Sequence, residues 1–194
     1  MAHIALFHSV LGVRPGVVDA AERLRSNGHE VLVVDQYGGR VFDDYDVASQ
    51  FAATIGYPEL MSRAVRAVAD LPDGFIAAGF SNGGGMAEHV ATIRSLSGAV
   101  LLSGALPLEM IGADVWPAGV PVQIHYTVGD PFRHSDWIEA LVTQVRAAGA
   151  VAEVFDYPGT GHLFTDPTLA AEYDEQAAAL LWSRVLLFCA TAVR

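Results

Sequence analysis

Short runs of apolar residues alternate along this chain with longer stretches in which apolar residues recur every three or four positions. The short runs predict buried strands, and the recurring pattern predicts amphipathic helices. The predicted strands cover residues 3–8, 30–35, 75–80, 98–103, 121–127 and 151–157. The predicted helices cover residues 15–27, 47–69 with a break near Gly56, a segment directly after Ser81, 135–148 and 168–193.

Strands that alternate with helices indicate a parallel sheet built from right-handed crossovers, with helices on both faces. The strands are nearly continuous apolar runs, which is typical of strands buried on both sides. No repeat, linker or low-complexity tract divides the chain. We therefore expect a single α/β domain over residues 1–194, with three layers and a mostly parallel sheet of about six strands. In such sheets ligands bind beyond the carboxyl ends of the strands.

One turn between a predicted strand and a predicted helix fits the pattern G-x-S-x-G, with Gly79, Ser81 and Gly83 at its fixed positions. The pattern alone is common, but an apolar strand directly before it and a helix directly after it are the context of a nucleophilic serine. Glycine on both sides lets strand and helix close around the serine and lifts its hydroxyl above the sheet. The competing interpretation is a glycine-rich helix start in which Ser81 is only the N-cap.

A serine hydroxyl needs a neighbouring base, and that base needs a third group that fixes its tautomer. For this kind of turn the expected chain order is serine, then an acid, then histidine. Among seven histidines, His162 is the candidate base because it follows the sixth predicted strand. Asp130 is the candidate acid because it follows the fifth, with Asp114 as the alternative. The competing interpretation of Asp130 is a turn residue before Pro131.

The charged oxygen that forms when a carbonyl is attacked needs two N–H donors about 3 Å away. The backbone of Asn82, directly after the serine, is one candidate. The second donor should come from the loop after the first strand, if that strand lies beside the Ser81 strand. Val10 is the predicted donor, with Ser9 nearby.

The formal net charge is −11, with only 11 Lys and Arg residues. A nucleic-acid partner and an anionic membrane surface both need a basic face, so neither is expected. The apolar segment 177–193 is short and contains Arg184, which favours a packed terminal helix over a membrane span. The N-terminus lacks a basic region ahead of its apolar run, so we predict a first strand, no signal peptide, and a cytoplasmic protein. The single cysteine, Cys189, is predicted to be a buried space-filler.

With these residues placed, the chain resembles the dienelactone hydrolase family of α/β-hydrolases. The resemblance covers nearly the whole chain and rests on the motifs HSVLGV at 8–13, VDQYG at 34–38, GFSNGG at 79–84, GD at 129–130 and GHLF at 161–164. It implies a triad of Ser81, Asp130 and His162, and oxyanion donors at Val10 and Asn82. It also implies a sheet in which the strands, numbered along the chain, are ordered two-one-three-four-five-six.

The sequence departs from the family pattern at three positions. The enzymes that gave the family its name use cysteine where Ser81 stands and glutamate where Ser9 stands, and the glutamate helps to activate the cysteine. A serine that is activated by His162 does not need that glutamate. These enzymes also hold the substrate carboxylate with an arginine a few residues after the histidine, whereas the matching place here is near Asp166. We expect this aspartate to repel an anionic substrate.

Only short segments connect the fourth strand to Asp130, which predicts a shallow, open pocket without a large lid. The residues expected to form its walls follow strands or lie near their ends: His8, Ser9, Tyr37, Trp116, Phe132 and Leu163.

The favoured hypothesis is a serine hydrolase that acts on a small-molecule ester or lactone without a cofactor or metal. Three alternatives remain at this level. A thioesterase or acyl-transfer enzyme would use the same triad, and a binding or scaffold protein would keep the fold without the chemistry. A metal-dependent hydrolase would use Asp43, Asp44 and Asp46 with a histidine, although these aspartates lack the spacing of metal ligands.

Overall fold

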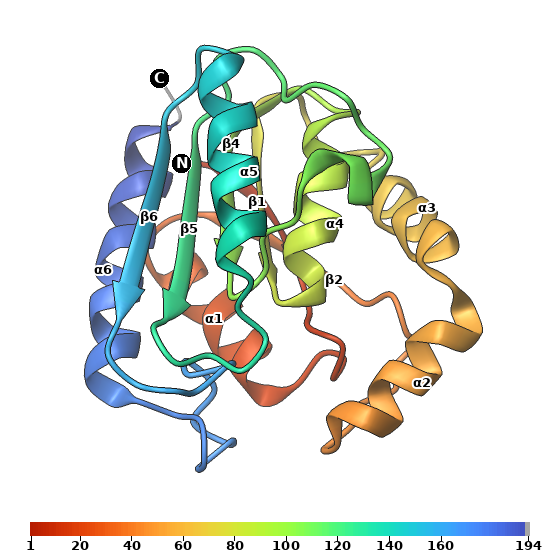
Figure 1. Ribbon diagram of the computed structural model, residues 1–194, viewed down its shortest axis with the longest axis vertical. Coiled ribbons are helices and arrows are strands. Elements are labelled where there is room, and N and C mark those ends of the chain that lie inside the picture. Colours follow the sequence, from red (N-terminus) through yellow and green to blue (C-terminus); the bar gives the residue numbers. More distant parts are fainter. Residues whose placement is uncertain (193–194) are drawn as a thin grey trace.

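A six-stranded parallel sheet runs through the centre of the molecule in the computed structural model, which describes residues 1–192 (Figure 1). The strand order is β2-β1-β3-β4-β5-β6, which confirms the predicted order. The strands are β1 (His3–Phe7), β2 (Glu30–Val34), β3 (Phe75–Phe80), β4 (Leu96–Leu102), β5 (Val122–Thr127) and β6 (Ala152–Tyr157). Each lies within two residues of its predicted bounds.

Helices cover both faces of the sheet and complete the predicted three-layer α/β architecture. They are α1 (Pro15–Ser26), α2 (Tyr45–Ile55), α3 (Tyr57–Ala67), α4 (Asn82–Ala91), α5 (Ser135–Ala147) and α6 (Glu175–Thr191), with a short 3-10 helix, η1 (Leu108–Ile111). The strand order reverses between β1 and β3, so right-handed crossovers place α1 on one face and α3, α4 and α5 on the other. Helix α6 lies beside α1, where the Arg23 guanidinium is 5.8 Å from the centre of the Trp182 ring.

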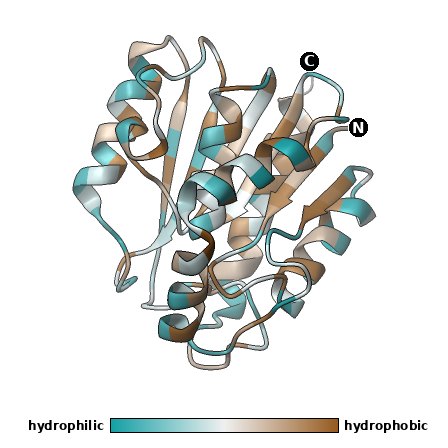
Figure 2. Cartoon of the chain, turned by 90° about the vertical axis from the view of Figure 1, so that its right-hand side faces the viewer, coloured by the Kyte–Doolittle hydropathy of each residue, from teal (hydrophilic) through white to brown (hydrophobic). Residues whose placement is uncertain are grey.

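The burial of the inner strands explains why continuous apolar runs in the sequence predicted them. All six residues of β3 and of β5 are buried, because helices cover both sides of these inner strands. The edge strand β6 has buried residues only at its two ends. In Figure 2 the apolar colouring is concentrated on the strands, whereas the helices show both polar and apolar residues.

The predicted break in the helix over 47–69 is confirmed. Gly56 separates α2 from α3 with φ 84° and ψ 140°, a conformation that favours glycine, and Pro58 lies in the first turn of α3. The Asp44 side chain accepts a hydrogen bond from the backbone N–H of Val47 and caps α2.

The predicted start of the last helix at residue 168 is wrong. Residues 168–174 form turns, and α6 begins after Asp174, whose carboxylate accepts a hydrogen bond from the N–H of Ala177. The capping side chain therefore sets the start of the helix, whereas the apolar pattern did not. The predicted end at 193 lies outside the described residues. Cys189 is 1% exposed, as expected for a space-filler. Within residues 1–192 every helix falls short of the length and apolar character that a membrane crossing requires.

Candidate active site

The candidate catalytic side chains all follow strands and meet at the carboxyl edge of the sheet, the lower edge in Figure 1. Ser81 follows β3, Asp130 lies three residues beyond β5, and His162 lies in the loop after β6. Parallel strands end at the same edge, so three segments that are far apart in the sequence deliver their side chains to one place.

The turn that carries Ser81 has a conformation that few residues adopt. Ser81 has φ 51° and ψ −117°, and its N–H donates to the Leu102 carbonyl at 2.7 Å. A Cβ atom at Gly79 would overlap the Gly83 carbonyl, and one at Gly83 would overlap the Phe7 and His8 carbonyls. The glycines thus let β3, α4 and the end of β1 approach closely, and the strain at Ser81 is of the kind found at functional sites.

Ser81, His162 and Asp130 form a continuous chain of hydrogen bonds. The His162 Nε2 atom is 2.7 Å from Ser81 Oγ, and its Nδ1 atom is 2.8 Å and 2.9 Å from the two carboxylate oxygens of Asp130. The Ser81 side chain makes no capping hydrogen bond to α4, which excludes the N-cap interpretation. Asp130 also accepts from the N–H of Phe132 at 2.8 Å, a turn contact that adds to its bond with His162.

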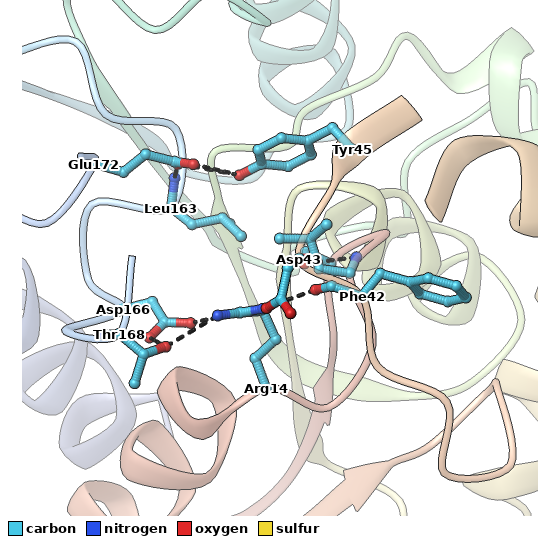
Figure 3. A network of polar contacts seen from close by, with 10 residues as sticks. Arg14, Phe42, Asp43, Tyr45, Leu163, Asp166, Thr168 and Glu172 are labelled. Carbon is cyan, nitrogen blue, oxygen red and sulfur yellow. Dashed lines mark hydrogen bonds and ion pairs between the residues drawn. The ribbon is translucent and has the colours of Figure 1, made fainter. Parts of the chain in front are cut away.

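Three hydrogen bonds hold the backbone around His162, and a fourth holds one of the side chains that make them. The Ser103 hydroxyl donates to the His162 carbonyl at 2.7 Å, and the Thr127 hydroxyl donates to the Gly161 carbonyl at 2.9 Å. On the other side, the Leu163 N–H donates to Glu172 at 2.6 Å, and the Tyr45 hydroxyl donates to the same carboxylate at 2.9 Å (Figure 3). The loop is therefore fastened at residue 161, at residue 162 and at residue 163.

Two aromatic rings flank the His162 imidazole. The Phe132 ring centre lies 4.6 Å from it, and the Tyr45 ring centre lies 5.9 Å from it. Burial and the adjacent Glu172 carboxylate raise the pKa of Tyr45, so its hydroxyl remains a donor. These rings limit the rotation of the imidazole about its side-chain bonds.

The predicted oxyanion donors lie on the same cavity as Ser81. The residues Phe7 of β1 and Gly79 of β3 are paired in the sheet, which brings the loop after β1 beside the Ser81 turn. Val10 and Asn82 both line the cavity. Within residues 1–192 neither backbone N–H has a hydrogen-bond acceptor in the protein. Both groups are thus free to donate to a bound oxygen.

A cavity of about 450 Å³ opens beside Ser81 and His162. The predicted pocket was shallow and without a large lid. The segment between β4 and β5 carries one short 3-10 helix, η1. Phe132 lines the cavity, as predicted, whereas His8, Ser9, Tyr37, Trp116 and Leu163 do not.

His8, Tyr37 and Trp116 belong to the core, so their predicted place in the pocket wall is wrong. His8 is fully buried, its Nε2 accepts from the Gln36 N–H at 3.1 Å, and its ring centre is 4.6 Å from that of Tyr37. Burial lowers the pKa of His8 and favours the neutral ring. The Trp116 indole donates to the Val120 carbonyl at 2.8 Å. In each case a partner in the core turns the side chain inward.

Ser9 and Leu163 line a second and much smaller cavity together with Asp166 and Arg14. The Asp166 carboxylate accepts from the Arg14 guanidinium at 3.3 Å and from Thr168 (Figure 3). On its other side Arg14 donates to Asp43 at 2.6 Å. Asp166 is therefore absent from the cavity beside Ser81, and the expectation that it repels a substrate there is wrong.

Sequence reasoning missed most of the cavity wall. Met61 of α3, Met86 of α4 and Met110 of η1 line it, together with Tyr126 of β5. A nearby buried carboxyl, Glu88, accepts from the Leu106 N–H at 3.0 Å, and burial raises its pKa well above the usual range. The one sequence signal was Met86, which lies on the helix directly after the turn that carries Ser81.

Two of the three aspartates of the metal hypothesis have other partners. Asp43 pairs with Arg14, and Asp44 caps α2. Among residues 1–192 no group of three or more His, Cys, Asp or Glu side chains could hold a metal ion.

Three solved structures illustrate how widely this fold is shared. A dienelactone hydrolase-like promiscuous phosphotriesterase from metagenomic libraries has a TM-score of 0.82 and 22% identity, and covers 100% of this chain and 87% of its own. A putative dienelactone hydrolase from Klebsiella pneumoniae has a TM-score of 0.76 and 21% identity, and the match covers 98% of this chain and 87% of the Klebsiella protein. A dienelactone hydrolase from Anabaena variabilis has a TM-score of 0.69 and 19% identity, and the match covers 100% of this chain and 88% of the Anabaena protein. At these identities the likeness concerns the fold alone.

A search of curated protein sequences found no match. The sequence model of the dienelactone hydrolase family, in contrast, matches residues 2–193, nearly the full length. The chain therefore belongs to the dienelactone hydrolase family and is a hydrolase on the α/β-hydrolase fold.

Proposed function

We propose that this protein is a serine hydrolase that cleaves small esters or lactones through an acyl-enzyme. The observation that carries the proposal is the 2.7 Å contact between His162 Nε2 and Ser81 Oγ, combined with the contact between His162 Nδ1 and Asp130. A nucleophile, a base and an orienting acid in hydrogen-bond contact are the requirement for this chemistry.

In the first half-reaction Ser81 Oγ bonds to the substrate carbonyl carbon while its proton passes to His162 Nε2. The carbonyl oxygen becomes an oxyanion that accepts hydrogen bonds from the N–H groups of Val10 and Asn82. The Asp130 carboxylate stabilises the imidazolium and keeps its tautomer. His162 then returns the proton to the leaving oxygen as the carbon–oxygen bond breaks, which leaves an acyl group on Ser81.

In the second half-reaction water attacks the acyl carbon and gives its proton to His162. The tetrahedral intermediate collapses, Ser81 Oγ recovers a proton from His162, and the carboxylic acid leaves. The proposal requires no group beyond those in the site.

The test compares the wild-type protein with Ser81→Ala on p-nitrophenyl acetate. We expect kcat to fall by roughly 10³-fold or more, because the remaining oxyanion donors provide only part of the rate. Ser183→Ala is a matched control, since Ser183 lies on the exposed side of α6 and its hydroxyl donates to the Leu180 carbonyl. A fluorophosphonate probe should label wild-type protein and not Ser81→Ala. Equal turnover by both proteins, or no labelling of the folded wild type, would contradict the proposal.

The same triad would cleave a thioester. A matched pair, phenyl butyrate and S-phenyl thiobutyrate, differs only in the oxygen or sulfur of the bond that is cleaved. This pair separates the two activities, and we expect the oxygen ester to react with the higher kcat/KM.

A further inference from the structure

The cavity beside Ser81 offers no fixed charge to a substrate. Within the described part of the chain, residues 1–192, its walls contain no Lys, Arg, Asp or Glu. Two arginines in loops at this edge are paired with carboxylates: Arg14 pairs with Asp43 and Asp166, and Arg133 pairs with Asp156 at 2.7 Å. Apart from His162, the only wall residue that can become cationic is His134, whose ring stacks on Trp137 at 3.9 Å.

Another part of the wall is apolar and contains three methionines. Met61, Met86 and Met110 come from three different elements and are joined by Leu106 and Ile111. Met86 is almost fully buried, whereas Met110 is 47% exposed and forms part of the rim. Unbranched thioether side chains adapt to apolar groups of different shape.

The size of the cavity exceeds that of a very small acyl group. A volume of about 450 Å³ corresponds to about fifteen water molecules at about 30 Å³ each. An acetyl group would leave most of the methionine wall in contact with water. A longer apolar chain would displace this water, and each methylene buried in this way should increase kcat/KM about threefold to fourfold.

From these observations we infer that the site takes neutral esters with an apolar acyl chain, which lies against Met61, Met86 and Met110, and that it rejects acyl chains that end in a carboxylate. A carboxylate on this wall would lose its water without gaining a Lys or Arg cation to balance its charge. The inference rests on the proposed hydrolase activity of Ser81 and adds the substrate class.

The first experiment measures kcat/KM for p-nitrophenyl acetate, butyrate and hexanoate, and for the p-nitrophenyl monoester of adipic acid. Hexanoate and monoadipate have the same number of acyl carbons, and they differ in whether the chain ends in a methyl group or a carboxylate. We expect kcat/KM for the hexanoate ester to exceed that for the acetate ester by at least about tenfold. It should exceed that for the monoadipate ester by at least about 100-fold. A flat series, or equal values for hexanoate and monoadipate, would overturn the inference.

The second experiment places a cation on the wall. Met61→Arg should lower the ratio of kcat/KM for hexanoate to kcat/KM for monoadipate by at least about tenfold, because the guanidinium can pair with the terminal carboxylate. Met61→Gln is the matched uncharged control, and it should lower hexanoate turnover without favouring monoadipate. Circular dichroism and Tm show whether both variants fold. If the arginine variant folds and the ratio is unchanged, the chain does not contact this wall.

The two proposals fail in different ways. If the fluorophosphonate probe labels Ser81 and acetate is hydrolysed while the acyl series is flat, the substrate class is wrong and the serine hydrolase stands. If neither labelling nor ester hydrolysis occurs, the proposed function itself is wrong.

Discussion

Two buried histidines of this molecule, His162 and His125, each have hydrogen-bond partners on both ring nitrogens. His162 lies at the edge of the sheet, between the carboxylate of Asp130 and the hydroxyl of Ser81. His125 lies in the middle of β5, with Nδ1 2.9 Å from the Tyr157 hydroxyl and Nε2 3.3 Å from the Gln123 side chain. The two differ in what surrounds them, although both are less than 5% exposed.

The surroundings of His125 oppose a positive charge. Burial and the nearby Arg184 lower its pKa to about 3, and the guanidinium of that arginine lies 4.3 Å from the ring centre of Phe155, on which His125 stacks. His162, in contrast, contacts a carboxylate that can balance an imidazolium. Under the proposed function, His162 can transfer a proton because a counter-charge and a hydroxyl lie on its opposite nitrogens, whereas His125 has no such counter-charge.

The largest expected effect comes from removing that counter-charge. In Asp130→Asn the amide keeps the shape of the side chain but not its charge, and it favours the wrong tautomer of His162. We expect kcat for p-nitrophenyl butyrate to fall by about 10³- to 10⁴-fold. Asp156→Asn is the control, since Asp156 is half exposed and its carboxylate pairs with Arg133 and not with His162. Its kcat should stay within about twofold of wild type. A comparable loss in both variants would mean that Asp130 has no special role.

A smaller effect should follow from loosening the loop that holds His162. Tyr45→Phe keeps the ring beside the imidazole and removes the hydroxyl that donates to Glu172. We expect kcat to fall by about tenfold with KM nearly unchanged, because the hydrogen bond to a charged group positions the base and does not bind substrate. Tyr45→Leu, which also removes the ring, should lower kcat further. If KM rises and kcat is unchanged, Tyr45 acts on substrate binding instead.

The smallest effect on catalysis should come from substituting His125. This substitution should instead change how the stability of the protein depends on pH. Its folded pKa of about 3 lies below the ordinary value of 6.5, so the unfolded chain binds the proton more readily between these values. The stability associated with neutral His125 is therefore complete above about pH 6.5 and is lost as the pH falls toward 3. Glutamine has no titratable group, so His125→Gln removes this contribution to the pH dependence of stability.

Thermal unfolding at about pH 7.5 and pH 4.5 checks this expectation. When the pH is lowered from the first value to the second, the free energy of unfolding should fall by up to about 2 kcal/mol more in the wild type than in His125→Gln. This difference corresponds to several degrees in Tm. Its kcat at the higher pH should stay near that of wild type. His8 is also buried with a lowered pKa, but it is present in both proteins and cancels in the comparison. Equal losses of Tm would show that His125 does not contribute to acid sensitivity.

The order of elements and the meeting of Ser81, Asp130 and His162 were predictable from the sequence, because both depend on local patterns. Continuous apolar runs set the inner strands, and a residue just beyond a parallel strand is delivered to one known edge. The chain order of serine, acid and histidine then selected one histidine from seven.

Which side chains line the cavity was decided by the tertiary structure. His8 and Tyr37 follow strands as expected, yet their rings turn toward each other in the core, and Asp166 turns toward an arginine 152 residues away in the chain. The methionine wall unites α3, α4 and η1, which no local pattern connects. Position after a strand determines where a backbone segment lies, whereas the direction of each side chain depends on packing and hydrogen bonds with segments that are distant in sequence.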